Sequence, residues 1–174
     1  MADALRRLGM IVRRFAESDA QALREIRLKG LKDHPENFGA DHDHEAVQPL
    51  DWWKRRIASG NGFGAWEGDV LVGIISFARQ AEKKHAHQGV IGGFYVRPAH
   101  RGRGIGDALM KAALEEAIKS VEHVTLTVTA SNAGAIRLYE RNGFKTVGRL
   151  IASIRVDSVD HDELSMHRRV SASD

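Results

Sequence analysis

One stretch of sequence decides the fold of this chain: FYVRPAHRGRGIG, residues 94–106. It combines the end of a β-strand, a turn with glycine at every second position, and the start of a helix. Backbone N–H groups at a helix N-terminus lack intrahelical partners and carry partial positive charge, so they bind phosphate well. Arg101 and Arg103 add full charges beside them. The stretch therefore predicts a site for the pyrophosphate of a cofactor.

The helix after this turn is predicted to pack on a sheet. Over residues 104–120, charged side chains of alternating sign recur every fourth residue, and nearly all others are apolar; the charged ones are Asp107, Lys111, Glu115 and Lys119. So narrow a polar stripe indicates a helix that is buried on most of its circumference. Residues 124–130 then alternate between apolar residues and threonine, which predicts a strand. Strand, helix and strand form a βαβ unit with a parallel strand pair.

Turn residues and periodicity predict the other elements. Ser18 opens a helix through a capping box that Gln21 completes, and this helix ends near Asp33. Further strands are expected at residues 10–16, 62–67, 70–79, 89–97, 144–156 and 162–170, with a hairpin turn at 68–69. Further helices are expected at residues 52–58, capped by Asp51, and from Ser131 or Asn132 to 142, before a left-handed C-terminal cap at Gly143.

These elements predict an α+β fold with a mixed, mostly antiparallel sheet of about seven strands, flanked by about four helices around the central βαβ unit. A single domain is expected over residues 10–170, with an N-terminal extension at 1–9 and a C-terminal tail at 171–174. Residues 33–50 form the longest connection, and a connection of this length is usually functional or mobile.

Composition excludes several classes of protein. The chain has 174 residues, 43% hydrophobic and 28% charged, as expected of one globular domain. A formal net charge of +3 is too small to indicate general nucleic-acid binding. There is no cysteine, which excludes disulfides, thiolate metal sites and a cysteine nucleophile. Because the sequence shows no signal-peptide core and no apolar run of about 18 residues, we expect a cytoplasmic protein without membrane contact.

Other phosphate-binding patterns do not match the glycine-rich turn. The Walker pattern needs Gly-Lys-Ser/Thr, and no lysine follows a glycine here. The dinucleotide-binding spacing Gly-x-Gly-x-x-Gly fails because Gly106 comes one residue early, and no acidic residue ends a strand about 20 residues later. An RNA-binding Arg-Gly tract would be longer and repeated, whereas this turn lies between a strand and a packed helix.

The remaining pattern is Arg-x-x-Gly-x-Gly after a strand that ends Val-x-Pro. It resembles the acetyl-coenzyme A signature of the GNAT superfamily of N-acetyltransferases, which Arg101, Gly104 and Gly106 match. A second block, NAGAIRLYERNGF at residues 132–144, is similar to the family pattern Asn-x-x-Ala-x-x-x-Tyr-x-x-x-Gly-Phe. One helix and one strand separate the blocks, and the element order matches from residue 10 to 169. The resemblance implies the family's fold, one N-acetyltransferase domain and acetyl-CoA as cosubstrate.

The same resemblance implies roles for individual residues. Backbone groups of Phe94, Tyr95 and Val96 are expected to contact pantetheine and to polarise the thioester carbonyl. Asn132 is expected to contact the pantetheine arm, and Tyr139 to protonate the departing sulfur. The alternative roles are a helix cap for Asn132 and a core aromatic for Tyr139. The pyrophosphate is expected on backbone N–H groups of Arg101, Gly102, Arg103, Gly104, Ile105 and Gly106.

No general base is identified. Some family members carry a glutamate on the strand before the turn, but residues 89–96 contain no carboxylate. Because an alkylammonium group titrates near about 10, the amine has to lose a proton or to arrive as its minor free-base form. The proton could leave through water or through a side chain elsewhere. The side chains considered are His85, His87, Glu36 and Glu45.

The acidic stretch Asp41-His42-Asp43-His44-Glu45 matches no metal-ligand spacing and is expected to be a solvated loop. A functional hypothesis places three carboxylates, Asp41, Asp43 and Glu45, with Trp52 and Trp53 at the mouth of the acceptor site. There they would attract a cationic amine. The alternative for the tryptophans is one core anchor beside one partly exposed ring.

The sequence thus predicts an acetyl-CoA-dependent N-acetyltransferase that acts directly on a small primary amine, with no metal and no nucleic-acid partner. Residues 33–58 are expected to select the acceptor, and the resemblance suggests that the protein could form a homodimer. The alternatives are acetylation of a protein N-terminus or lysine, and a non-catalytic acyl-CoA sensor. A nucleic-acid-binding module that uses Arg101 and Arg103 is a third alternative, and it predicts strongly salt-dependent binding.

Overall fold

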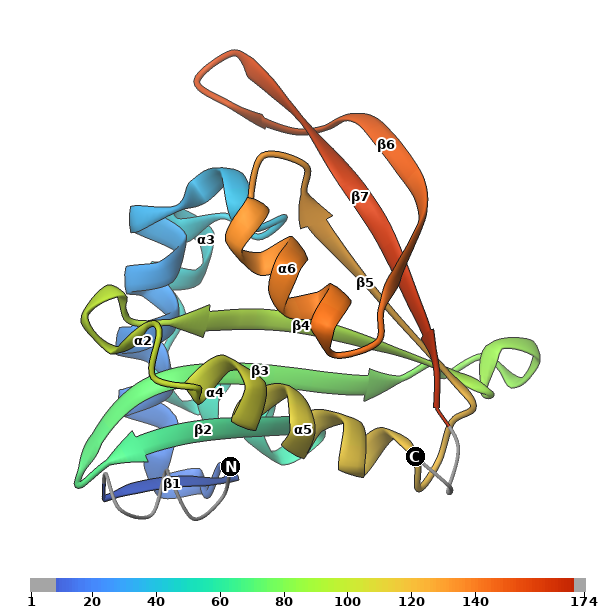
Figure 1. The fold of residues 1–174 in the computed structure, drawn as a ribbon. Coiled ribbons are helices and arrows are strands. Elements are labelled where there is room, and N and C mark those ends of the chain that lie inside the picture. Colours follow the sequence, from blue (N-terminus) through green and yellow to red (C-terminus); the bar gives the residue numbers. More distant parts are fainter. Residues whose placement is uncertain (1–8, 171–174) are drawn as a thin grey trace.

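The computed structural model describes residues 9–170, in which a seven-stranded sheet lies between two groups of helices (Figure 1). The strand order is β1-β2-β3-β4-β5-β7-β6, and every neighbouring pair is antiparallel except β4 and β5. The strands are β1 (Met10–Arg14), β2 (Asn61–Glu67), β3 (Val70–Arg79), β4 (Gln88–Val96), β5 (His123–Thr129), β6 (Lys145–Val156) and β7 (Val159–Arg169). The predicted mixed sheet and its βαβ unit are confirmed.

Five α-helices occur within residues 9–170, one more than expected. They are α2 (Ala20–Asp33), α3 (His42–Ala46), α4 (Leu50–Ser59), α5 (Ile105–Ala117) and α6 (Ala133–Arg141). The additional helix is α3, which lies inside the connection expected to contain no helix, residues 33–50. Asp41 caps it by accepting a hydrogen bond from the His44 N–H at 3.0 Å. None of the described helices combines the length and the apolar character of a membrane span.

Two apolar clusters cover the two faces of the sheet. On one face α5 packs on β2 and β3, where Leu109 and Ala113 lie in one cluster with Val72. On the other face α2 and α4 bring Ile26 and Trp53 against Leu71 and Tyr95. Figure 1 shows α5 and α6 in front of the sheet and α2 and α4 behind it. The narrow polar stripe of α5 thus predicted its burial correctly, although only Lys111 and Glu115 pair within the predicted column, at 3.7 Å.

Several predicted caps and boundaries were wrong. The N–H of Ala16 donates to the carboxylate of Asp19 at 2.7 Å, at a 3₁₀ turn (Glu17–Asp19) before α2, so Ser18 opens no capping box with Gln21. Helix α4 begins directly after Pro49, so Asp51 is not its cap. Strand β7 begins at Val159 because Asp157 and Ser158 adopt positive φ, which permits a two-residue hairpin.

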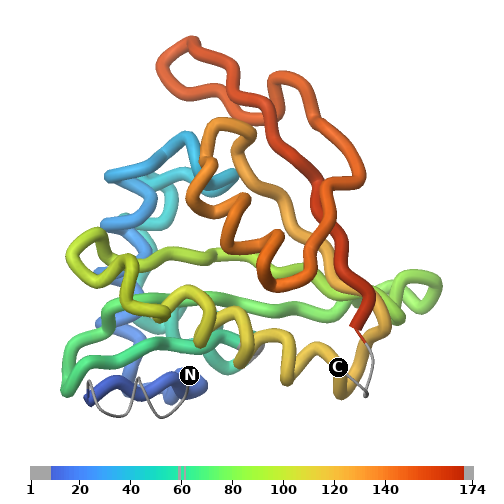
Figure 2. The backbone as a smooth tube through the Cα atoms, in the orientation of Figure 1, coloured from blue at the N-terminus to red at the C-terminus, as the bar shows by residue number. Residues whose placement is uncertain are grey.

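The sheet opens between its two parallel strands. Only three residues of β4, Gln88 to Val90, pair with β5, and the two strands separate beyond them. The smooth trace in Figure 2 shows this divergence, with α6 beside the opening. Because the remaining residues of β4 have no neighbour on that side, their backbone groups face a gap in the sheet.

Candidate functional site

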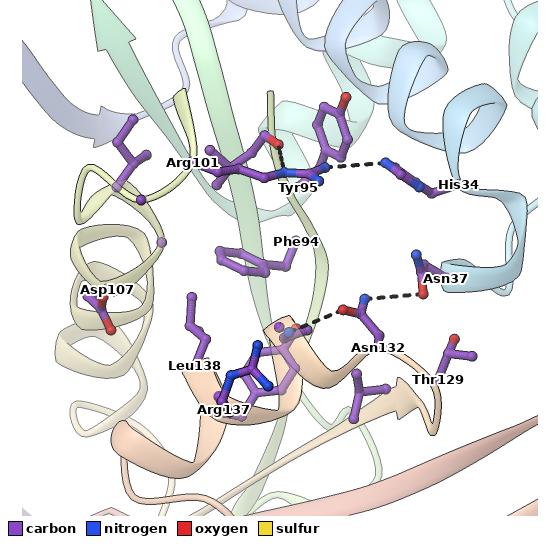
Figure 3. Close-up of a pocket in the computed structure, with 18 of the residues that line it drawn as sticks. His34, Asn37, Phe94, Tyr95, Arg101, Asp107, Thr129, Asn132, Arg137 and Leu138 are labelled. Atoms are coloured by element: carbon purple, nitrogen blue, oxygen red, sulfur yellow. Dashed lines mark hydrogen bonds between the residues drawn. The ribbon is translucent and has the colours of Figure 1, made fainter. Parts of the chain in front are cut away.

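A cavity of about 600 Å³ lies where β4 and β5 separate. Its walls come from four places in the chain, as Figure 3 shows: the end of β4, the turn before α5, the β5–α6 region, and the segment after α2. The residues on which the site depends are His34, Asn37, Phe38, Phe94, Tyr95, Val96, Arg101, Gly104, Gly106, Thr129, Asn132 and Tyr139. This volume is in the range of sites that bind small molecules.

The end of β4 presents backbone groups to the cavity. The register between β3 and β4 shifts between Ile74 and Ser76, and Gly93 adopts a φ of +59° there. Such a bulge bends a strand and changes the direction of its N–H and C=O groups. Phe94, Tyr95 and Val96 follow the bulge and line the cavity, and their contacts with pantetheine stay a prediction.

The turn after β4 ends in an open helix N-terminus. Gly104 precedes α5 with a φ of +78°, a left-handed conformation that side-chain-bearing residues rarely adopt. No side chain caps α5, and the first backbone bond of the helix runs from the Ala108 N–H to the Gly104 carbonyl at 3.1 Å. The N–H groups before Ala108 are therefore placed to receive an anion.

The two arginines of the turn behave differently. Arg101 lines the cavity; its Nε donates to the Val96 carbonyl at 3.0 Å, and an Nη lies 3.3 Å from His34 Nε2. The side chain of Arg103 instead donates to Glu67 at 2.6 Å, and Arg103 does not line the cavity. Arg103 lowers the pKa of the Glu67 carboxyl. The expected charge of Arg103 beside the cofactor is thus neutralised by an ion pair that anchors the turn to β2.

The third glycine of the turn allows two helices to approach closely. A Cβ on Gly106 would overlap Leu138 of α6 and lie 3.3 Å from the Phe94 ring. The same pair of helices is joined at the surface, where Arg141 donates to both carboxylate oxygens of Asp107 at 2.7 and 2.8 Å. These contacts fix the distance between two walls of the cavity.

Asn132 caps a helix and also lines the cavity. Its Oδ1 accepts a hydrogen bond from the Ala135 N–H at 3.1 Å and so caps α6, while the residue also lines the cavity. Its Nδ2 donates to Asn37 Oδ1 at 3.1 Å, a contact across the cavity that Figure 3 shows. The helix cap and a ligand contact are therefore compatible roles.

Tyr139 lies between two phenylalanines at the inner end of the cavity. Its ring centroid is 6.0 Å from that of Phe94 and 6.1 Å from that of Phe144, and only 6% of the residue is exposed. Burial raises the pKa of the Tyr139 hydroxyl well above its usual value. No described side chain forms a hydrogen bond with that hydroxyl. The phenol thus stays protonated and is available to donate.

The wall opposite α6 was not predicted residue by residue. It is formed by His34, Asn37 and Phe38, around a 3₁₀ turn (Pro35–Asn37) that follows α2. Thr129, at the end of β5, holds this turn through a 2.6 Å hydrogen bond to the Glu36 carbonyl. The sequence indicated only that residues 33–50 were a long connection bordering the acceptor.

The structure corrects the hypothesis about the acidic stretch. Glu45 is buried, and both of its oxygens accept hydrogen bonds from Arg27 at 3.1 Å, with Arg56 at 3.4 Å. Asp41 caps α3, and neither Asp41 nor Asp43 lines the cavity. Trp53 is fully buried whereas Trp52 is partly exposed, so the alternative of one core anchor and one partly exposed ring is confirmed.

The four side chains considered as general bases do not line the cavity. Glu45 is held in the ion pair with Arg27, and His85 and His87 precede β4, at the end away from the turn. Glu36 lies behind the wall, 3.7 Å from His34 Nδ1. Within residues 9–170, no group of three or more His, Cys, Asp or Glu side chains is arranged to hold a metal ion.

Comparison with known proteins agrees with this geometry. The model of the acetyltransferase (GNAT) family matches residues 26–144. The L-amino acid N-acetyltransferase AaaT of Escherichia coli is 30% identical over 149 residues, which cover 81% of this chain and 86% of that protein. The L-methionine sulfoximine/L-methionine sulfone acetyltransferase of Salmonella typhimurium is 28% identical over 79% of this chain and 81% of that protein. A mycothiol acetyltransferase of Brachybacterium faecium is 30% identical over 81% of this chain but only 42% of its own length.

Solved structures share the fold. A GNAT acetyltransferase from Streptococcus pneumoniae superposes with a TM-score of 0.83 at 18% identity, over 93% of this chain and 99% of that one. The yncA protein of Salmonella typhimurium, solved with its cofactor acetyl-CoA, gives 0.78 at 22% identity, over 93% and 94% of the two chains. At these identities the likeness concerns the architecture.

Proposed function

The chain belongs to the acetyltransferase (GNAT) family, and from this premise we propose that it transfers the acetyl group of acetyl-CoA directly to the primary amine of a small molecule. It is a GNAT-type N-acetyltransferase with acetyl-CoA as its cosubstrate. The proposal concerns the acceptor, the direct transfer and the roles of individual residues. The single domain over residues 10–170, the cytoplasmic location and the homodimer stay predictions from the sequence; residues 1–8 and 171–174 lie outside the described part.

The residues present fit acetyl-CoA. The uncapped start of α5 and Arg101 offer N–H donors and positive charge for a pyrophosphate. The free edge of β4 offers backbone groups to the amides of a pantetheine arm. Arg137 of α6 also lines the cavity and is exposed, which adds a second cation to its lining. We refer to β4 residues 91–96, the turn 101–106 and α6 residues 132–139 as the donor wall.

The chemistry that acetyl-CoA supplies is an acetyl group on a good leaving thiol. We propose that backbone N–H groups of the donor wall near Phe94, which lines the cavity, donate to the thioester oxygen, where negative charge develops. Tyr139 donates its proton to the departing sulfur, because its buried phenol is neutral and no side chain within residues 9–170 forms a hydrogen bond with it. The chain has no cysteine for an acyl-enzyme, which supports direct transfer between the two substrates.

One observation carries the choice of a small acceptor. Residues 34–38, the acceptor wall, are connected to the donor wall through Asn37 and Asn132 at 3.1 Å and through His34 and Arg101 at 3.3 Å. These contacts cross the cavity, where a polypeptide acceptor would need an open groove. The named substrates of two relatives, methionine sulfoximine and L-amino acids, are small primary amines and support the same choice.

The test measures thiol release from acetyl-CoA with a panel of amines: L-methionine sulfone, L-methionine, L-leucine, spermidine, kanamycin and a peptide with a free N-terminus. We expect turnover with at least one small amine and a much lower kcat/KM for the peptide. A higher kcat/KM for the peptide would favour the protein acetyltransferase. Binding of acetyl-CoA without thiol release for any amine would favour the non-catalytic sensor and contradict the proposal.

A further inference from the structure

The cavity contains few groups that could accept a proton near neutral pH. Among the described residues that line it, the titratable candidates are Asp107, His100 and His34. Asp107 is held by Arg141 and Asn142, and Arg141 lowers the pKa of its carboxyl. His100 is bound to Glu67 at 3.0 Å through Nε2, and its Nδ1 is buried. His34 is the remaining candidate, with 32% of its side chain exposed.

The surroundings of His34 distinguish its two ring nitrogens. Nδ1 lies 3.7 Å from Glu36 Oε1, and Nε2 lies 3.3 Å from an Nη of Arg101 (Figure 3). Glu36 Oε1 accepts a hydrogen bond from Asn37 Nδ2 at 3.0 Å, and its negative charge, 3.7 Å from Nδ1, favours a proton on that nitrogen. Arg101 can only donate, so Nε2 carries a lone pair that is directed at the guanidinium of Arg101, another residue that lines the cavity. The other groups that face this histidine are the Tyr95 ring, at 6.4 Å, and Asp33, which is paired with Lys29.

We infer that His34 is the general base of this N-acetyltransferase and that Glu36 is its positioning residue. The inference rests on the proposed function, because a base is needed only if an amine is acetylated. His34 belongs to the acceptor wall, whereas the acid Tyr139 belongs to the donor wall. The two proton-transferring groups therefore come from different walls, and each reaches the reacting atoms directly or through one water.

The contact with Arg101 connects the base to the donor. An Nη of Arg101 occupies the Nε2 lone pair of His34, and the same side chain lines the pyrophosphate site. A phosphate is a stronger acceptor for a guanidinium than a neutral imidazole is. Binding of a phosphate in the turn thus draws Arg101 away from His34 and frees the lone pair. The base becomes available once the donor site is filled.

The protons balance over one turnover. The nitrogen of the free amine forms the C–N bond as the C–S bond breaks, and its N–H becomes acidic while the bond forms. His34 Nε2 accepts that proton and passes it to water. Tyr139 gives a proton to the sulfur and recovers one from water, so an amine and a thioester yield an amide and a thiol with no net proton change.

The test compares His34→Gln with wild type, using the member of the amine panel that has the highest turnover. Glutamine keeps an acceptor oxygen for Arg101 but cannot take up a proton. We expect kcat to fall about 100-fold, the acidic limb of the kcat–pH profile to disappear, and the KM for acetyl-CoA to stay within about twofold. Glu36→Gln should lower kcat by a smaller factor and keep the acidic limb of the kcat–pH profile. His85→Gln, at a residue outside the cavity, should change neither kcat nor the profile. Free imidazole should restore part of the turnover of His34→Ala.

A second measurement uses the imidazole signals of His34 in NMR spectra, with and without coenzyme A. We expect the Nε2 signal to shift when coenzyme A binds wild type, and to be insensitive to coenzyme A in Arg101→Gln. A His34→Gln variant with wild-type kcat and an unchanged pH profile would overturn the inference. If wild type released no thiol with any amine of the panel, the proposed function itself would be contradicted, so the two failures are distinguishable.

Discussion

The two walls of the cavity offer different kinds of groups to the ligands that we propose for them. The donor wall uses mostly backbone groups: the free edge of β4 and the uncapped N-terminus of α5. The acceptor wall uses the side chains of His34, Asn37 and Phe38. Backbone recognition requires glycines at fixed spacing, whereas side-chain recognition requires only that certain side chains reach the cavity. The residues proposed to bind the donor therefore form a recognisable sequence motif, whereas those proposed to bind the acceptor do not.

If a residue of the donor wall protonates the leaving sulfur, Tyr139→Phe should cause the largest decrease in kcat among the variants of the two walls. We expect kcat to fall about 100-fold while the KM for acetyl-CoA stays within about twofold, because only the proton donor is removed. Steady-state kinetics of thiol release measure both values. A kcat equal to that of wild type would leave Tyr139 as a core aromatic only.

The same substitution has a consequence for stability at high pH. Because burial raises the pKa of Tyr139 above that of a free tyrosine, about 10, the folded state keeps a proton that the unfolded state loses. The stability that results is fully present below about pH 10 and declines as the pH rises above it. Urea unfolding across this range should show a smaller decline for Tyr139→Phe than for wild type. Equal declines would mean that the phenol ionises without unfolding.

A substitution at Gly104 tests whether backbone groups of the donor wall bind acetyl-CoA. In Gly104→Val a β-branched residue must adopt a φ of +78°, which costs about 2 kcal/mol or displaces the turn. We expect the KM for acetyl-CoA to rise about 30-fold, the factor that this energy corresponds to. Gly68→Val is the matched control, because Gly68 has a φ of +57° in the β2–β3 turn, outside the cavity. Equal KM values for the two variants would show that the turn does not bind the donor.

The acceptor wall should respond more weakly and only toward the amine. Thr129→Val removes the 2.6 Å hydrogen bond to the Glu36 carbonyl, a loss of about 1 kcal/mol in positioning. We expect the KM for the amine to rise about fivefold and that for acetyl-CoA to stay constant. Thr125→Val is the control on the same strand, because Thr125 contacts Gly89, away from the cavity. A larger change for acetyl-CoA than for the amine would mean that the two walls are not separate.

The smallest effect is expected for the double variant Asp41→Asn, Asp43→Asn. Neither carboxylate lines the cavity, so the KM for a cationic amine should change less than about twofold. The measurement should be made at low ionic strength, where long-range attraction is strongest. A clear increase in KM would restore the hypothesis that these carboxylates attract the acceptor.

Most cavity-lining residues of the donor wall could be named from the sequence, and their contacts with acetyl-CoA stay predictions. Gly104 reflects a local requirement, a left-handed residue before α5, whereas Gly106 matches the family motif and is required by the close approach of Leu138 from α6. The stripe of α5 and the alternation of β5 are equally local, because burial of one face dictates both. The exception is Arg103, whose partner Glu67 lies 36 residues away.

The acceptor wall depends on contacts between distant residues. The bonds from Thr129 to Glu36 and from Asn132 to Asn37 join residues 93 and 95 positions apart. No spacing rule connects such positions, so His34 and Asn37 could not be singled out beforehand. Glu45 illustrates the opposite error: it lies in a polar run typical of a solvated loop, yet Arg27, 18 residues earlier, holds it in the interior.

The three-residue ladder between β4 and β5 has a thermodynamic consequence. Because the sheet has fewest hydrogen bonds at this place, the strands before and after it are joined there mainly by side-chain packing. A molecule that lies between the two strands and contacts both replaces the missing ladder. If acetyl-CoA lies there, as we propose, it is a part of the folded structure as well as a reactant, and the free energy of unfolding depends on its concentration. Such an enzyme is most resistant to denaturation when its acetyl donor is abundant.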